Sequence, residues 1–292
     1  PISGRCRGSM TPTLLSPTRL TLSARALVRF GGAEAVDFLN DLITADAATI
    51  PEGQLRPAML LTPQGRVLFD LLISHDGDDL VIELDRERRA EFIKKMTLYR
   101  MRRAVTITPD DRAVEVKING DEGLIDPRFD GSVRRLYAAS DQNDQPAINP
   151  QDETLWQAYR YRQGVAEGAN DLPPEKALPL EARLDLNDGI SFQKGCYIGQ
   201  EVTARTRYRG LIKRSYLPVR LNQPIETPCD VMAEGRLVGD VLGLVQDEGG
   251  WLGLASIRLD ALAAEIALTA DGQAITPLFP ERLMPLPAPK DK

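Results

Sequence analysis

Residues 194–201 decide how the fold of this chain is interpreted, and they read Lys194-Gly195-Cys196-Tyr197-Ile198-Gly199-Gln200-Glu201. Gly195 and Gly199 permit a positive φ and a close approach of another molecule to the backbone. Lys194 would favour the thiolate of Cys196, which is the form that attacks carbon or binds metal. A cysteine in a glycine-rich turn can also be a small apolar residue whose neighbours only shape the turn. The octapeptide alone leaves both interpretations open.

The flanking sequence carries a longer signature. The octapeptide is preceded by Leu178-Pro179-Leu180-Glu181-Ala182-Arg183-Leu184-Asp185-Leu186-Asn187-Asp188-Gly189-Ile190-Ser191-Phe192-Gln193 and followed by Val202-Thr203-Ala204-Arg205-Thr206-Arg207-Tyr208-Arg209-Gly210. Two more blocks belong with it, Phe38-Leu39-Asn40-Asp41-Leu42-Ile43-Thr44-Ala45-Asp46 and Leu61-Thr62-Pro63-Gln64-Gly65-Arg66-Val67-Leu68-Phe69-Asp70. Together they resemble the YgfZ family, the folate-binding relatives of the glycine cleavage system T-protein that include mitochondrial iron–sulfur assembly factors. The resemblance extends from Leu14 into the C-terminal part of the chain.

The resemblance implies an α+β fold of three domains. These would form a ring of the T-protein type around a central folate channel, with ferredoxin-like α+β units and a small C-terminal β-barrel. The expected division assigns residues 10–46 and 113–209 to a discontinuous folate-binding domain. Residues 47–112 would form a second α+β domain, and residues 210–292 the barrel.

Hydrophobic periodicity predicts the individual elements. Helices are expected over 33–44, 86–99 and 153–163, and strands over 56–61, 67–74, 80–84, 105–108 and 114–118. Residues 138–153 read as an exposed connection, and residues 170–179, with three prolines, as an ordered loop that leads into Glu181. Short alternating runs at 215–221, 236–246 and 251–259, punctuated by Gly and Pro, are typical of a small β-barrel.

Composition excludes several classes of protein. With 36 basic and 42 acidic side chains the net charge is −6, which gives no overall attraction to nucleic acid or to an anionic membrane. Three widely spaced cysteines, Cys6, Cys196 and Cys229, do not make a disulfide framework or a zinc ribbon. His75 is the single histidine, so a multi-histidine metal site is excluded. General-base chemistry would have to use carboxylates.

Glu181 is the expected pterin ligand. Its segment Leu180-Glu181-Ala182-Arg183-Leu184 is similar to the T-protein segment whose glutamate binds the pterin ring. A carboxylate can accept two parallel hydrogen bonds from a ring N–H and an exocyclic amine. The alternative is a surface carboxylate paired with Arg183 or Lys176.

Asp70 is a charge inside the apolar run 67–73, where burial without a partner would be costly. A similarly placed aspartate of the T-protein faces the reactive folate nitrogen, so the resemblance implies a proton acceptor or polar contact for a reduced folate. The T-protein has two adjacent acids there, whereas this chain has Phe69-Asp70. This difference weakens the case for aminomethyl transfer. An outward-facing strand position is the alternative.

Arg205, Arg207 and Arg209 alternate, so in an extended segment all three would point to one side. Such a patch could bind the carboxylates of a folate tail, which arginine recognises bidentately, and Tyr208 could stack on an aromatic ring. The alternative is a solvated basic strand. A second basic cluster, at 86–103, could contact RNA or an acidic protein, but Phe92, Ile93 and Met96 favour an amphipathic helix with its charges in solvent.

The leading functional hypothesis is a tetrahydrofolate-binding accessory protein for the assembly or repair of iron–sulfur proteins, with a functional thiol at Cys196. Any cluster held through Cys196 would need further ligands from another chain or from a small thiol. The expected partners are folate, in the form of tetrahydrofolate or a one-carbon derivative, and assembly proteins or client iron–sulfur enzymes. One alternative is an enzyme, a tetrahydrofolate-dependent aminomethyltransferase or demethylase. The other is a noncatalytic interaction module with a structural Cys196.

The expected location is the bacterial cytoplasm, or the mitochondrial matrix if the chain is eukaryotic. No apolar run approaches the roughly 20 residues that span a bilayer. Residues 1–9 contain Arg5 and Arg7 without an apolar core, which does not match a secretory signal and is thin for a transit peptide. Met10 is the expected start of the native chain.

Overall fold

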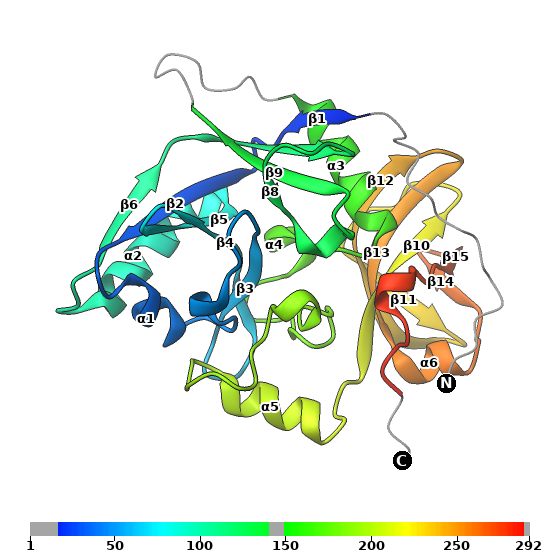
Figure 1. Cartoon of the computed structure of the whole chain (residues 1–292). Coiled ribbons are helices and arrows are strands. Elements are labelled where there is room, and N and C mark those ends of the chain that lie inside the picture. The colour runs from blue at the N-terminus through cyan, green and yellow to red at the C-terminus, as the bar shows by residue number, and fades with distance from the viewer. Residues whose placement is uncertain (1–16, 140–148, 289–292) are drawn as a thin grey trace.

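Three groups of strands build the protein, and the computed structural model describes residues 17–139 and 149–288 of it (Figure 1). They are a five-stranded sheet, a four-stranded sheet and a closed barrel, and helix α4 lies between them. Cys6, Met10 and most of the predicted connection at 138–153 lie outside the described residues. The mixture of helices with antiparallel sheets and a terminal barrel confirms the predicted fold class.

The five-stranded sheet has the order β3-β4-β5-β2-β6, with all neighbours antiparallel. Its strands are β2 (Arg25–Gly31), β3 (Arg56–Leu61), β4 (Val67–Asp76), β5 (Asp79–Asp85) and β6 (Thr106–Asp110). The strands predicted for this region are confirmed to within two residues at each end. A hairpin turn joins β3 to β4, closed by a 2.8 Å hydrogen bond from the Gly65 amide to the Thr62 carbonyl oxygen.

Two helices pack on this sheet. The predicted helices are confirmed with shorter bounds, as α1 (Ala35–Asn40) and α2 (Arg89–Arg100), with 3-10 turns η1 (Ala47–Thr49) and η2 (Arg86–Arg88). Phe38 of α1 and Phe92 and Met96 of α2 are buried in one apolar cluster with the sheet. Because α2 buries Phe92 and Met96 and exposes Lys94, it has the predicted amphipathic character.

The four-stranded sheet has the order β1-β7-β9-β8. Its strands are β1 (Thr18–Thr21), β7 (Ala113–Ile118), β8 (Leu124–Ile125) and β9 (Val133–Ala138), with η3 (Pro127–Phe129) between the last two. Helix α3 (Pro150–Arg162), predicted over 153–163, packs its Trp156 and Tyr159 in one cluster with residues of this sheet. Asn149 caps α3 by accepting a hydrogen bond from the Gln151 amide at 3.1 Å.

The strand pairing bears on the expected domain boundaries. Strand β2 falls within the segment 10–46, but it pairs with β5 and β6 of the five-stranded sheet. Strand β1 pairs with β7 of the other sheet. The chain therefore passes from one sheet to the other between β1 and β2, ahead of the expected boundary after residue 46. The division into three domains stays a prediction.

The C-terminal strands close into a barrel of order β10-β13-β12-β11-β14-β15. The elements are β10 (Arg214–Leu221), β11 (Cys229–Ala233), β12 (Arg236–Asp247), β13 (Gly250–Arg258), α6 (Leu259–Ala263), β14 (Leu268–Ala270), β15 (Gln273–Pro277) and η5 (Glu281–Leu283). The three alternating runs predicted here are confirmed to within one residue. Their inward apolar residues form a separate core cluster that includes Leu217, Val241 and Ile257.

The connecting segment 163–210 contains α4 (Gly168–Asp171), η4 (Leu186–Asp188) and α5 (Gln200–Tyr208). Helix α5 corrects one prediction, because the arginines at 205–209 were expected in an extended segment. A helix forms because Gly199 starts it at φ 81° and Val202 packs against the Gly65 turn. A Cβ on Gly199 would lie 2.6 Å from the Thr62 carbonyl oxygen, so this approach requires glycine.

Among the described residues, no helix is long and apolar enough to cross a bilayer.

Candidate functional site

The Cys196 thiol lies on an exposed loop between η4 and α5. Gly195 is also exposed, and a Cβ added there would meet nothing within 4 Å. The next residue, Tyr197, is buried in a cluster with Met59 and Leu180. The thiol is therefore open to another molecule, while its neighbour anchors the loop to the core.

The ammonium of Lys194 fastens this loop to the segment that follows α1. Its Nζ donates three hydrogen bonds of 2.7 Å each, to the carbonyl oxygens of Asn40, Ile43 and Ala45. Burial lowers the pKa of Lys194 to about 8, against the opposing charges of Asp46 and Asp41. Because all three N–H bonds are used, none is left for a Cys196 thiolate. Lys194 therefore positions the loop, and its expected effect on the Cys196 thiolate stays a prediction.

Replacing Lys194 with methionine should loosen the loop, because three carbonyl oxygens lose a charged donor. Hydrogen bonds to charged groups contribute roughly 1.5–3 kcal/mol each, and water can replace part of this, so we expect the free energy of unfolding to fall by about 2–3 kcal/mol. Urea unfolding measures this change. Lys213→Met removes an exposed lysine and should change stability by less than about 0.5 kcal/mol. Equal stability of the two variants would mean that the three bonds do not hold the loop.

The three alternating arginines do not form a single-sided patch. Arg205 of α5 and Arg209, the C-cap residue of this helix, are four residues apart and share one side. Arg207 points elsewhere, with its guanidinium carbon 4.1 Å from the centroid of the Phe192 ring. The Tyr208 ring, which is 73% exposed, meets Phe192 edge to face at a centroid distance of 6.1 Å. The prediction of one patch made by three arginines is wrong. Arg207 and Tyr208 instead pack on Phe192, and these three side chains form a wall.

This wall lines a cavity of about 660 Å³ beside the loop, called here the thiol-side cavity. Its lining comes from the segment after α1, from the loop before Cys196 and from α5: Asp46, Thr49, Arg56, Asp188, Ile190, Ser191, Phe192, Gln193, Lys194, Arg207 and Tyr208. Residues from three separate stretches of sequence therefore meet next to the thiol.

Glu181 lies partly buried at the contact with the barrel, where its carbonyl oxygen accepts a hydrogen bond from the Tyr216 amide at 3.0 Å. The pKa of Tyr216 is raised by burial and then by the charges of Glu181 and Asp171. Arg183 donates to the Leu283 carbonyl oxygen rather than to Glu181, so the predicted alternative pairing is absent. No hydrogen bond or ion pair within 17–139 and 149–288 uses the Glu181 carboxylate. Its oxygens remain available to a ligand.

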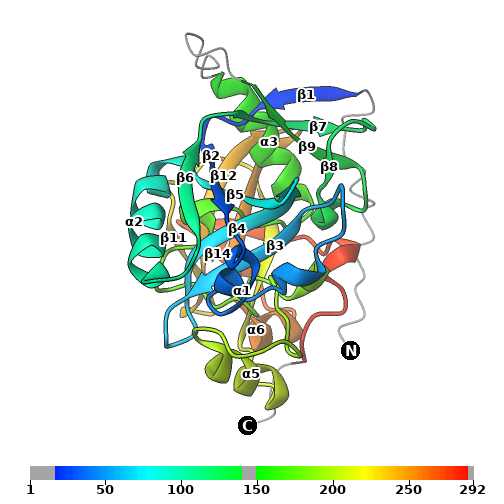
Figure 2. The same ribbon diagram turned by 60° about the vertical axis from the view of Figure 1, so that its left-hand side comes forward.

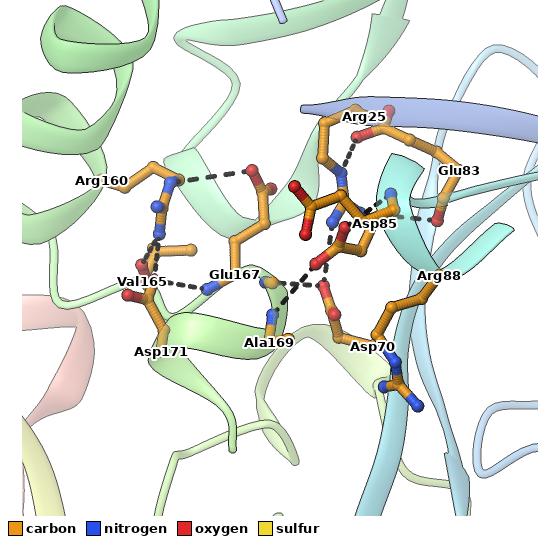
Figure 3. Close-up of polar contacts among 12 residues, drawn as sticks. Arg25, Asp70, Glu83, Asp85, Arg88, Arg160, Val165, Glu167, Ala169 and Asp171 are labelled. Atoms are coloured by element: carbon orange, nitrogen blue, oxygen red, sulfur yellow. Dashed lines mark hydrogen bonds and ion pairs between the residues drawn. The ribbon is translucent and has the colours of Figure 1, made fainter. Parts of the chain in front are cut away.

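Asp70 of β4 is partly buried and bound on both sides. One carboxylate oxygen accepts a hydrogen bond from the Gly168 amide at 3.1 Å and from Arg25 Nη1 at 3.3 Å (Figure 3). Asp85 similarly accepts from the Ala169 amide at 3.3 Å. Two aspartates of the five-stranded sheet thus hold the first residues of α4, so the alternative of an outward-facing Asp70 is wrong.

Glu167 lies at the centre of a buried ionic network that the sequence patterns did not indicate, and Figure 3 shows its contacts with Arg160 and Asp171. Its carboxylate accepts hydrogen bonds of 2.7 Å from Arg128 and Arg135 and of 2.9 Å from the Trp156 indole. Burial alone would raise the pKa of Glu167, but the charges of Arg135, Arg25, Arg128 and Arg160 hold it well below its ordinary value. The network ties the four-stranded sheet to α3 and to the start of α4.

Asp171 extends the network toward the barrel. Its carboxylate accepts hydrogen bonds from Arg160 at 2.7 Å, from the Tyr161 hydroxyl at 2.6 Å and from the Glu167 amide at 2.9 Å. Within the network, Glu83 carries a usable signal in the sequence, since it interrupts an apolar run as Asp70 does, but Glu167, between Ala166 and Gly168, carries none. Which arginine faces which carboxylate depends on contacts across as many as 58 residues of sequence and could not be predicted.

The described residues contain no group of three or more Cys, His, Asp or Glu side chains arranged to hold a metal ion. Of their two free cysteines, Cys196 is exposed and Cys229 is half-buried in the barrel strand β11. Cys196 can therefore supply one ligand to a metal centre, and the described chain offers no complete set.

Comparison with a solved structure confirms the fold. The chain is similar to the glycine cleavage system aminomethyltransferase T from Bartonella henselae, with a TM-score of 0.69 over 94% of this chain and 88% of that one. The two sequences are 14% identical, so this likeness concerns the fold alone. Residues 213–285 match the family model of the CAF17 C-terminal β-barrel domain.

Similarity to curated proteins covers most of the chain. It is 32% identical to the mitochondrial iron–sulfur cluster assembly factor IBA57 of Mus musculus, over 90% of this chain and 85% of that protein. The corresponding protein of Homo sapiens is 31% identical over 85% and 80%. These matches confirm the resemblance that begins at the Cys196 octapeptide. The chain belongs to the family of the iron–sulfur cluster assembly factor IBA57, whose bacterial counterpart is the YgfZ family.

Proposed function

We propose that this protein is an iron–sulfur cluster assembly factor that presents the Cys196 thiol to a cluster. The observation that carries the proposal is an exposed thiol on a loop that Lys194 holds with three 2.7 Å hydrogen bonds. A loop fixed in this way keeps the Cys196 thiol in one position, where it can ligate a cluster while different partner proteins dock and leave. The names of the relatives in Mus musculus and Homo sapiens support the same role.

A cluster bound here is cargo that needs further ligands. Iron–sulfur clusters are commonly held by four thiolates, and Cys196 supplies one. We infer that assembly proteins or client iron–sulfur enzymes supply the others by docking beside the loop. The relatives named above are mitochondrial proteins. Whether this chain acts in a bacterial cytoplasm or in the mitochondrial matrix stays a prediction.

We infer that a reduced folate, tetrahydrofolate or a one-carbon derivative, binds with its pterin at Glu181. The carboxylate of Glu181 has no partner among the described side chains, and Tyr216, the adjacent buried tyrosine, offers a hydroxyl. These groups fit a ring with neighbouring N–H donors. Bound tetrahydrofolate would supply one-carbon chemistry, and this chain's residues would hold and orient it.

The contacts of Asp70 favour the assembly role over aminomethyl transfer. Its carboxylate already accepts from Arg25 and from the Gly168 amide, and the residue before it in the sequence is Phe69 rather than a second acid. An acceptor held in this way is suited to fixing α4 rather than to accepting protons from a substrate. The transferase or demethylase reaction and the noncatalytic module stay alternatives.

Glu181→Gln should weaken tetrahydrofolate binding by about tenfold to a hundredfold, because it removes charge-assisted hydrogen bonds worth roughly 1.5–3 kcal/mol. Isothermal titration calorimetry under anaerobic conditions measures the change. Glu226→Gln, at an exposed position of the barrel domain, is the matched control and should bind like the wild type. If Glu181→Gln binds tetrahydrofolate as tightly as the wild type, the pterin does not bind at Glu181.

The proposed function is tested in cells that lack the gene. Iron–sulfur enzymes should lose activity in the deletion strain, enzymes without clusters should not, and the full chain expressed from a plasmid should restore the lost activity. Normal iron–sulfur enzyme activity in the deletion strain under iron limitation and oxidative stress would contradict the proposal.

A further inference from the structure

The thiol-side cavity has the size and position of a ligand site. Its volume of about 660 Å³ falls within the range of roughly 300–1,000 Å³ of small-molecule sites. Lys194, which lines it, precedes Cys196 by two residues, a span of at most about 7 Å of chain. A small molecule in this cavity would therefore lie close to the thiol.

One wall of the cavity offers an arginine ready to bind an anion. The guanidinium carbon of Arg207 lies over the Phe192 ring, 4.1 Å from its centroid, and no carboxylate of the described residues forms an ion pair with it. A stacked guanidinium keeps its edge N–H groups free for bidentate contact with a carboxylate. The exposed Tyr208 ring extends the same wall outward. Such a large exposed aromatic surface beside an unpaired cation is typical of a binding site.

The remaining charged groups of the cavity have both signs. Arg56 pairs with Asp188 at 2.5 Å, and Asp46 caps η1 through the Ala48 amide at 3.0 Å. Three cations, from Arg56, Lys194 and Arg207, face two carboxylates, from Asp46 and Asp188. This balance suits a small ligand that carries carboxylates together with an ammonium group.

Because the cavity lies beside Cys196, a ligand that carries sulfur suits it. If the protein acts as proposed above, a cluster at Cys196 needs thiolates in addition to this one. The only other free cysteine in the described parts of the chain is Cys229, which belongs to barrel strand β11. A thiol delivered through the cavity would supply one of the missing thiolates, losing its proton to solvent when iron binds.

We propose that the thiol-side cavity binds a small anionic peptide thiol of the glutathione class, held by Arg207 through a carboxylate, so that its sulfur becomes a second ligand of a cluster at Cys196. The inference rests on the proposed function for the role of the sulfur. Binding of the peptide itself rests on the cavity and on Arg207 alone.

Calorimetric titration of the full chain with reduced glutathione tests this. The wild type should give a saturable isotherm at millimolar concentrations, and S-methylglutathione should bind similarly because the cavity recognises the carboxylates. Arg207→Gln should weaken binding about tenfold or more, since it removes a charged hydrogen-bond donor. Arg209→Gln, an exposed arginine at the end of the same helix that does not line the cavity, should bind like the wild type. Cys196→Ser should also retain binding.

Two results would overturn the inference. One is no saturation of the wild type, and the other is an equal loss of affinity in Arg207→Gln and Arg209→Gln, which would mean non-specific attraction to a basic helix. Unchanged thermal unfolding of both variants keeps the comparison valid. Absence of glutathione binding in a protein whose Cys196 is needed in cells would remove this inference and leave the proposed function standing. Arg207-dependent binding in a protein whose deletion spares iron–sulfur enzymes would support the peptide site and contradict the proposed function.

Discussion

Cys196→Ser should leave iron–sulfur enzyme activity at the level of the deletion strain. Serine keeps the size of the side chain, but its hydroxyl stays protonated near neutral pH and does not replace a thiolate as a ligand for iron. The effect should be close to complete, because no other cysteine in the described residues shares this loop. The measurement is the activity of a cluster-dependent enzyme in extracts of the complemented deletion strain.

The matched control for this prediction is Cys229→Ser. Cys229 lies half-buried in β11, and burial raises the pKa of its thiol, so it is a poor source of thiolate. This variant should restore activity to the wild-type level. Because Cys196 is exposed, its serine variant should also unfold within about 0.5 kcal/mol of the wild type. Full restoration by Cys196→Ser would make the thiol dispensable and would favour the interaction module.

Glu167→Gln should lower the free energy of unfolding by about 3–5 kcal/mol, because removing one partner of a buried ion pair leaves the other charge uncompensated. Arg135 is fully buried, and its Nη2 donates to Glu167 at 2.7 Å, while Arg128 donates to the same oxygen. The amide oxygen of glutamine can still accept from the Trp156 indole in the place of Oε1, but its NH2 group then lies where Oε2 accepted from Arg128 and Arg135. The expected loss therefore includes the charge and both of these hydrogen bonds. Urea unfolding at pH 7 measures it.

A surface pair supplies the control. Glu122→Gln removes the partner of Lys117 in an exposed ion pair of 3.2 Å, and its expected effect is at most about 1 kcal/mol. Losses of similar size in the two variants would contradict the central role of Glu167.

The stability difference between the wild type and Glu167→Gln should also depend on pH. The folded-state pKa of Glu167 lies well below the ordinary 4.5, so between these two values the unfolded state binds more protons than the folded state. Stability from this carboxylate is then present above pH 4.5 and is lost as the pH falls through the folded-state value. The difference between the two proteins should shrink as urea unfolding is repeated at successively lower pH below 4.5.

The elements with regular hydrophobic periods were predictable from the sequence. Strand β3 matches its predicted bounds, and the barrel strands β10, β12 and β13 differ from theirs by one residue at most. Helix α5 was not predictable in this way, because alternating arginines satisfy a strand period and Arg205 and Arg209 equally satisfy a helical one. The helix is selected over a strand by tertiary contacts, because Gly199 and Val202 pack against the distant turn at Gly65.

In the candidate site, too, some features could be predicted from the sequence and others depend on packing. Cys196 and Asp70 stand out against their neighbours in the local sequence, whereas Glu181 was named from the resemblance of its segment to the T-protein, and the roles of all three stay predictions. The partners of Asp70, by contrast, come from Arg25 and Gly168, 45 and 98 residues away along the chain. Contacts of this kind depend on how the elements pack, and local patterns carry no record of that packing.

Contiguous residues were enough to predict the family and the elements with a regular hydrophobic period, and to single out Cys196 as the candidate reactive thiol. Only tertiary packing shows that Lys194 donates to three carbonyl oxygens, that Arg207 turns onto Phe192, and that Glu167 lies among four arginines. The physical reason is that charged and hydrogen-bonding groups take their roles from whichever partners burial brings within about 3 Å. Those partners are set by the way the two sheets, α5 and the barrel pack together (Figure 2).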